Sequence, residues 1–320
     1  MIKPVLRQVI FSLALVAAAL VGSAAAASDE GQAPSPAPLL NLQDQVIKTD
    51  TTWSGTVIIE GVVVIGRAAT LTIAPGTAIR FRKIDRDLDG TGDSELRVLG
   101  GIIAEGTAGK PITFASAEPE PAPRDWSYLL IYTSGRLNRL NFCEFRHGFS
   151  GLQVQFSTAS VKNSLFTNNN EGLRFGRADL AVENNRFVNN SIGIRFTRME
   201  GPVLIRNNEI NGNRIGIFLV PSGQNIRDFF EPDRGGRAWN TGRLEIGANN
   251  IHDNLAYNLS LGEKQLWNLD MSGNYWGTDQ GKLIEATIFD RHRDESLGKV
   301  IYKPCAAEKI PEAGPIGADR

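Results

Sequence analysis

The sequence predicts an all-β solenoid, a single-stranded parallel β-helix with a short C-terminal cap. A pattern repeats every 21 to 23 residues when the chain is aligned on Phe145, Phe166, Phe187 and Ile210. Each repeat contains two short segments of alternating apolar and polar residues, separated by Asn-rich corners. Helical periodicity is missing from this region. So short a period predicts coils stacked one on the next, with parallel neighbouring strands about 4.8 Å apart.

The first 27 residues have the pattern of an export signal. Lys3 and Arg7 form a basic start, an apolar run follows at 9–21, and small residues occupy 22–27. This order predicts a secretory signal peptide over 1–27, because the apolar run is short for a membrane span. We therefore expect an exported protein, periplasmic or extracellular, with no transmembrane segment in the mature chain.

The rest of the chain divides by composition. Residues 28–44 are rich in Pro, Ala and Ser and predict a disordered leader. The β-helix is expected over 45–278, with one large loop insertion at 221–240 that interrupts the repeat. Residues 279–303 lose the repeat and predict a cap over the open end of the stack, and 304–320 predict a flexible tail.

Charge and cysteine content exclude some classes of protein. The net charge is −1, and no basic stripe of the kind that binds nucleic acid is present. Cys143 and Cys305 are the two cysteines. A disulfide between them is possible after export, but their separation along the stack argues against it.

Segments at both ends of the predicted stack resemble a known group of proteins. The segments 70–81 (TLTIAPGTAIRF), 96–107 (LRVLGGIIAEGT) and 110–114 (KPITF) resemble the opening coils of bacterial right-handed parallel β-helix proteins of the pectin-lyase-like superfamily. The segment 273–278 (GNYWGT) and the residues after it are similar to their closing segment, and the repeats between resemble those of carbohydrate-binding and sugar-hydrolysing members. The resemblance implies that the coils of the parallel β-helix wind in the right-handed sense. It leaves the function open, because the superfamily includes lyases, hydrolases, epimerases and adhesins.

An Asn column is the most visible motif. Asn185, Asn208, Asn249 and Asn274 share one position of the repeat, between inward apolar positions. A row of amides can bind a sugar, but the flanking apolar residues favour a buried ladder that satisfies backbone groups at a corner.

A second column, Gln153, Arg174 and Arg195, alternates with buried positions and is expected to face solvent. Two guanidinium groups about 5 Å apart repel each other unless an anion lies between them. That anion is a ligand such as a uronate carboxylate, or it is Glu171 or Asp179 of the chain itself. The first alternative predicts ligand-binding residues, and the second predicts a charge-balanced face.

An acidic loop follows the opening coils. Carboxylates crowd the stretch DRDLDGTGDSE, and hard oxygen ligands at such spacing are what Ca²⁺ prefers. The alternative is a solvated acidic turn. The candidate ligands for a structural calcium ion are Asp85, Asp87, Asp89, Asp93 and Glu95.

A carboxylate pair is the best candidate for catalysis. Glu245 and Asp270 each lie six residues before an anchor position on adjacent coils, which predicts a separation of about 5 Å. The alternative is a charge-balanced outer face. Neighbouring columns and the loop insertion add four candidate ligand-binding residues: Arg206, Arg243, Phe229 and Phe230.

Two other sets of residues are weaker candidates. Glu144 and Glu209 share a column but lie three coils apart, roughly 14 Å, which is too far for a catalytic pair. His147, His252 and His292 are too scattered for a metal cluster and are expected at the surface or in loops.

These patterns favour an exported binding protein for a carbohydrate or cell-surface glycan. One alternative is a polysaccharide lyase or glycoside hydrolase that acts on acidic polysaccharide. Another is an envelope rod or adhesin without a small ligand.

Overall fold

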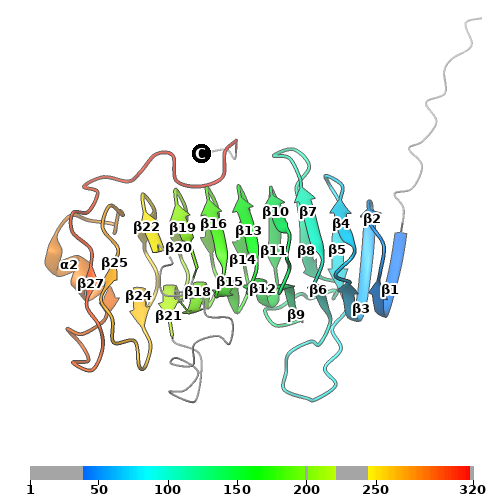
Figure 1. Cartoon of the computed structure of the whole chain (residues 1–320). Helices are drawn as coiled ribbons and strands as arrows, with labels where there is room; N and C mark the ends of the chain where they lie inside the picture. Colours follow the sequence, from blue (N-terminus) through cyan, green and yellow to red (C-terminus); the bar gives the residue numbers. More distant parts are fainter. Residues whose placement is uncertain (1–38, 199–200, 221–243, 318–320) are drawn as a thin grey trace, which may run out of the picture. The chain divides into compact units, whose positions relative to one another are not determined.

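The computed structural model describes residues 39–198, 201–220 and 244–317, and these form parallel strands stacked along one direction (Figure 1). Every paired strand runs parallel to its neighbour, and corresponding positions of successive repeats are register partners, such as Phe145, Phe166 and Phe187. The predicted parallel β-helix is therefore confirmed. Three ladders of strands make up its sides.

The first and second ladders begin beside β3 (Thr56–Ile65), which pairs with β1 (Leu39–Ile47), β5 (Ala78–Phe81) and β6 (Glu95–Val98). The first ladder contains β5 (Ala78–Phe81), β8 (Ile112–Ser116), β11 (Cys143–Arg146), β14 (Leu165–Thr167), β17 (Arg186–Val188), β20 (Glu209–Asn211) and β23 (Asn250–His252). The second contains β6 (Glu95–Val98), β9 (Trp126–Tyr132), β12 (Gly148–Gln155), β15 (Glu171–Gly176), β18 (Ile192–Arg198), β21 (Ile215–Leu219), β24 (Tyr257–Leu261) and β26 (Ile288–Phe289). The third contains β2 (Thr51–Trp53), β4 (Thr70–Ile73), β7 (Gly101–Glu105), β10 (Leu137–Asn141), β13 (Thr158–Lys162), β16 (Asp179–Glu183), β19 (Val203–Arg206) and β22 (Leu244–Gly247).

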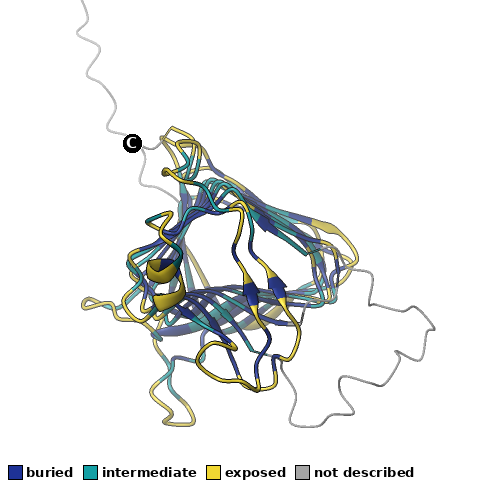
Figure 2. Cartoon of the chain, turned by 90° about the vertical axis from the view of Figure 1, so that its left-hand side faces the viewer, coloured by how far each residue is buried: buried dark blue, intermediate teal, exposed yellow. Residues whose placement is uncertain are grey.

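The inward side chains of the three ladders form one core, and buried segments surround it in the view along the stack (Figure 2). Phe114, Phe145, Phe166 and Phe187 stack face to face with ring centroids 4.9, 4.7 and 4.6 Å apart. This spacing matches the distance between hydrogen-bonded strands, so each coil contributes one ring to a continuous column.

The Asn column is a buried ladder, as the structural interpretation predicts. The side-chain amide of Asn185 donates to Oδ1 of Asn208 at 3.0 Å and to the carbonyl of Val161 at 2.9 Å. The pattern continues through Asn249 to Asn274. These bonds satisfy polar groups that burial would otherwise leave unpaired, which excludes a sugar-binding role for this column.

A second buried amide ladder was missed by the sequence analysis. It lies three residues after each anchor position, at the corner between the first and second ladders. Its members are the buried Asn169, Asn190 and Asn213 and the half-buried Asn254. An Asn at this offset in four successive repeats is the signal in the sequence that predicts it.

The start of the fold differs from the prediction. The disordered leader was predicted over 28–44, but β1 begins at Leu39 and pairs with β3 through most of its length. The prediction is therefore wrong for residues 39–44. Alternation was weak there because β1 is an end strand with one neighbour and mostly exposed side chains. The predicted signal peptide and residues 28–38 lie outside the described residues.

The C-terminal end begins with α2 (Gly281–Ala286), which buries Ile284. A two-stranded sheet of β25 (Leu269–Asp270) and β27 (Val300–Ile301) completes this end. Within the described residues, no helix is long and apolar enough to cross a membrane.

The predicted flexible tail over 304–320 is wrong for the residues that the structure describes. Residues 304–317, called the strap below, run back along the stack from its capped end (Figure 1). Backbone groups of the strap are bonded to the corners of the coils, for example from Gly314 N to the carbonyl of Asn207 at 2.9 Å. The Pro- and Gly-rich composition predicts flexibility. The contacts that fix the strap are made to coils far away in sequence, so the local composition carries no sign of them.

Candidate functional site

The outer face of the second ladder carries a cluster of charges around Glu171. Its carboxylate is 1% exposed and lies 2.5 Å from Nη1 of Arg195, on the next coil. Arg174, on the coil of Glu171 itself, is 3.9 Å away, and the hydroxyl of Ser150 donates to Glu171 at 2.8 Å. The register aligns Arg174 with Arg195 as the sequence predicts. Of the two carboxylates of the chain considered above, Glu171 is therefore the one that lies beside both guanidinium groups.

This cluster has an excess of positive charge. Two guanidinium groups share one buried carboxylate, and their side chains are 27% and 25% exposed. Burial lowers the pKa of Arg174, with Arg195 adding to the shift and Glu171 opposing it. The Nε atoms of Arg174 and Arg195 have no hydrogen-bond partner among the described residues. The partial exposure of the two side chains leaves part of their positive charge facing solvent.

The two positions that flank Arg174 and Arg195 in this column are not exposed charged residues. Gln153 is buried, with its amide donating to Ser150 at 3.1 Å, so the expectation that it faces solvent is wrong. On the other side, the guanidinium of Arg195 lies over the ring of Phe218, 5.9 Å from its centroid. An aromatic ring one coil from a cation gives the face both apolar and charged surface.

An ion pair in β6, the first strand of the second ladder, lies at the start of the same outer face. Glu95 is buried and paired with Arg97, and it accepts a hydrogen bond from Tyr128. Burial is the main cause that raises the pKa of Glu95, and the Arg97 charge opposes it. The Glu95 carboxylate is thus already bound by side chains of the fold itself.

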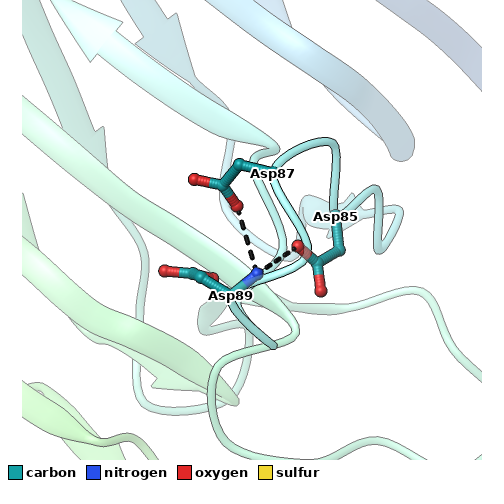
Figure 3. Close-up of side chains that lie close together, drawn as sticks. All are labelled: Asp85, Asp87 and Asp89. Carbon is teal, nitrogen blue, oxygen red and sulfur yellow. Dashed lines mark hydrogen bonds between the residues drawn. The ribbon is translucent and has the colours of Figure 1, made fainter.

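The acidic loop brings three of its five predicted ligands together. Carboxylate oxygens of Asp85, Asp87 and Asp89 lie within 4.8 Å of one another. Asp85 and Asp87 accept hydrogen bonds from the backbone N–H of Asp89, at 3.1 and 3.3 Å (Figure 3). Oxygen donors at this spacing fit a hard cation such as Ca²⁺.

The other two predicted ligands have different partners. Asp93 accepts a hydrogen bond from the backbone N–H of Arg86 at 2.7 Å, and Glu95 lies in the buried pair described above. Glu95 thus does not join the three aspartates, because a strand begins at this residue and its side chain packs against Arg97 and Tyr128.

The candidate catalytic pair lies near the end of the third ladder. The backbone N–H of Ala248 donates to the carbonyl of Gly273, so the coils of Glu245 and Asp270 are neighbours. Glu245 is half-buried in β22, whereas Asp270 is exposed in β25. Hydrogen bonds from Ser272 lower the pKa of Asp270, which favours its ionised form. This suits a nucleophile or base better than a general acid.

Arg206 has a partner on the preceding coil. Its Nη2 lies 2.7 Å from Glu183, which also pairs with Lys162 at 2.8 Å. The three side chains form an ion-pair row on the third ladder. Arg243, Phe229 and Phe230 lie outside the described residues.

One cluster was missed by the sequence analysis, which placed His252 among surface or loop residues. Nε2 of His252 lies 2.8 Å from Glu209, and its Nδ1 lies 2.7 Å from Asp253. Asn250 and Lys309 also bond Glu209, at 2.9 and 3.1 Å. The hydrogen bond with Glu209 is the main cause that raises the pKa of His252, against desolvation.

The pKa of Glu209 is shifted in the opposite direction, downward. Burial alone would raise its pKa, but hydrogen bonds from His252, Asn250 and Lys309 outweigh burial and lower it. The cluster therefore favours a carboxylate beside an imidazolium. Lys309 comes from the strap, 100 residues further along the chain, and no repeat pattern could predict it.

Comparison with known proteins agrees with this architecture. Residues 124–251 match a family model described as a right handed beta helix region. The match begins just before β9 and ends in β23. Together with the three parallel ladders, it shows a right-handed parallel β-helix protein. Searches of the curated proteins and of the solved structures found no match.

Proposed function

We propose that this protein is exported and binds an acidic polysaccharide or cell-surface glycan on the outer face of the second ladder. The supporting observation is that Arg174 and Arg195 share the single carboxylate of Glu171. Among the described residues, one positive charge of this group remains in excess on side chains that are about a quarter exposed. A uronate carboxylate has the charge and the planar geometry that a guanidinium group binds best.

The repeat suits a chain-like ligand. The register places Phe218 beside Arg195 and Gln153 beside Arg174, so chemically different side chains follow one another at coil spacing. A polymer laid along the stack would meet a cation on two successive coils and an aromatic ring on the next. A neutral glycan would gain less, because the excess charge would stay unpaired.

The test compares binding of uronic-acid polysaccharides with that of neutral ones of similar size. Arg174→Gln is the informative variant, because Glu171 keeps its close partners Arg195 and Ser150. We expect at least a tenfold loss of affinity for the acidic glycan, since a charge-assisted hydrogen bond contributes about 1.5–3 kcal/mol.

Arg139→Gln is the matched control, since Arg139 pairs with Glu105 on the exposed third ladder. Equal affinity for acidic and neutral glycans, or equal losses in both variants, would refute the proposed face. Absence of binding to any glycan would favour the rod or adhesin.

The same panel tests the catalytic alternative. New reducing ends or unsaturated products that disappear in Glu245→Gln and Asp270→Asn would replace the binding function by a hydrolase or lyase. Binding without turnover is the outcome that the proposed function predicts.

We also propose a structural Ca²⁺ on the acidic loop, held by Asp85, Asp87 and Asp89. A bound ion would relieve the repulsion among three carboxylates and stabilise the folded chain by mass action. Added Ca²⁺ should raise the melting midpoint of chelator-treated protein by several degrees, and Asp87→Asn should reduce this rise. Asp179→Asn, a change at an exposed carboxylate in β16, should leave it unchanged. The same midpoint with calcium and with chelator would refute the site.

A further inference from the structure

The strap is fixed to the coils along most of its length. Asn250 holds Ile310 by two hydrogen bonds: its Oδ1 accepts from the Ile310 N–H at 2.8 Å, and its Nδ2 donates to the Ile310 carbonyl at 3.0 Å. Asn184 donates to the carbonyl of Glu312 at 3.0 Å, and Asn163 accepts from the backbone N–H of Ile316 at 3.2 Å. The wall that the strap forms is therefore a defined part of the fold.

Between the strap and the outer side of the first ladder lies a groove of about 700 Å³. One end is bounded by the ion pair of Lys309 with Glu209. At the other end the groove reaches the turn at Thr107 and Ala108, close to Gly317 of the strap. A volume of this size accommodates a small organic ligand.

The walls of the groove are largely apolar. Strand residues and the two bounding segments contribute aliphatic, aromatic and proline side chains from opposite sides. The main ones are Pro111, Phe142, Leu165, Ile310, Pro311 and Ile316. Such walls favour a ligand with an apolar body.

One charge in the groove has no counter-ion among the residues that the structure describes. The Glu144 carboxylate pairs with Arg146 at 2.8 Å, and Glu209 is paired with His252 and Lys309. Arg186, which lies between Leu165 and Glu209 in the register, has no ion pair within the described residues. Its guanidinium group therefore supplies the free charge of the groove.

We propose that the groove under the strap binds an apolar monocarboxylate. The carboxylate pairs with Arg186, and the hydrocarbon body lies between Phe142 and Leu165 on the coils and Ile310 and Pro311 on the strap. A cationic ligand is disfavoured, because both acidic groups of the groove already have partners. Because the ligand contacts both walls, its binding also holds the strap against the first ladder.

The test uses octanoate, with octanol and octylamine as matched probes, in titration calorimetry on the full chain. Saturable binding of octanoate is expected, with at least tenfold weaker binding of octanol, which lacks the charge. Arg186→Gln should weaken octanoate at least tenfold and leave octanol unchanged. Arg214→Gln, at an exposed arginine outside the groove, is the control and should bind octanoate as the unmodified chain does.

Proteolysis gives a second measurement. Octanoate should slow tryptic cleavage after Lys309 in the unmodified chain and should not do so in Arg186→Gln. No saturable binding of octanoate, equal binding of octanol, or equal affinity in Arg186→Gln would each overturn the proposal. These outcomes are independent of the glycan face, because Arg174 and Arg195 lie on the second ladder.

Discussion

The outer faces of the first and second ladders arise from the same repeat, yet they end in different surroundings. On the second ladder, Arg174 and Arg195 remain partly exposed around Glu171. On the first ladder, Glu209 at an equally outward position is 6% exposed, because the strap and His252 cover it. The comparison teaches that the repeat sets which way a side chain points. The cover over an outward side chain then comes either from neighbouring coils, as for Glu171, or from a non-repeating segment, as for Glu209.

The largest effect should come from the core that both faces share. Phe166 is fully buried and stacks on Phe145 and Phe187, with centroids 4.7 and 4.6 Å away. Phe166→Ala should lower the free energy of unfolding by about 3–5 kcal/mol, because it removes one ring from a continuous column and leaves a cavity. Denaturant unfolding measures this loss.

Leu137→Ala provides the control, since Leu137 is 53% exposed on the outside of the third ladder. Its cost should stay within about 0.5 kcal/mol. Similar costs for the two variants would contradict the stacked core.

A smaller and more local effect should separate the two faces. Glu209→Gln removes the charge that His252 and Lys309 contact and should cost about 1–3 kcal/mol, as expected for hydrogen bonds between charged groups. The strap should become more sensitive to trypsin at Lys309. Affinity at the Arg174 face should stay the same, and a parallel loss there would show that the faces are coupled.

The smallest effect should be a pH dependence carried by His252. Its folded pKa is raised above the ordinary value of 6.5, mainly by Glu209. The stabilisation is thus fully present below about pH 6.5 and is lost as the pH rises through the folded pKa. Unfolding followed across this range should show a fall in stability that His252→Gln lacks.

The pH dependence of stability is expected to arise from the charged groups around His252, and chiefly from Glu209. Glu209, Asp253 and Lys309 are the charged groups beside the imidazole that were described above. Asp253→Asn should reduce the slope only slightly, because Asp253 is 84% exposed and well solvated. An unchanged slope in His252→Gln would assign the pH dependence to another group.

Much of the fold was predictable because its signals are local. Apolar residues recur at the same offsets from Phe145, Phe166 and Phe187, and these offsets fix the inward positions and the register. The buried ladder of Asn185, Asn208, Asn249 and Asn274 followed from its position between them. The alignment of Arg174 with Arg195 followed from the same register.

The partners of the outward charges were less predictable. Glu171 was one of two possible counter-ions from the chain, and the choice depends on side-chain geometry. Glu95 was assigned to a metal site, but it is buried beside Arg97 and Tyr128. Glu209 was considered only as half of a catalytic pair, whereas its partners are His252, Asn250 and Lys309.

The sequence by itself determined the stack, its spacing and the alternation of inner and outer positions, because a repeat of 21 to 23 residues encodes these in every coil. Only the tertiary structure decided that residues 304–317 are a strap and that a groove lies beneath it. The physical reason is that the strap is bonded to coils as far as 153 residues away in the chain. Contacts of that separation leave no periodic trace in the sequence.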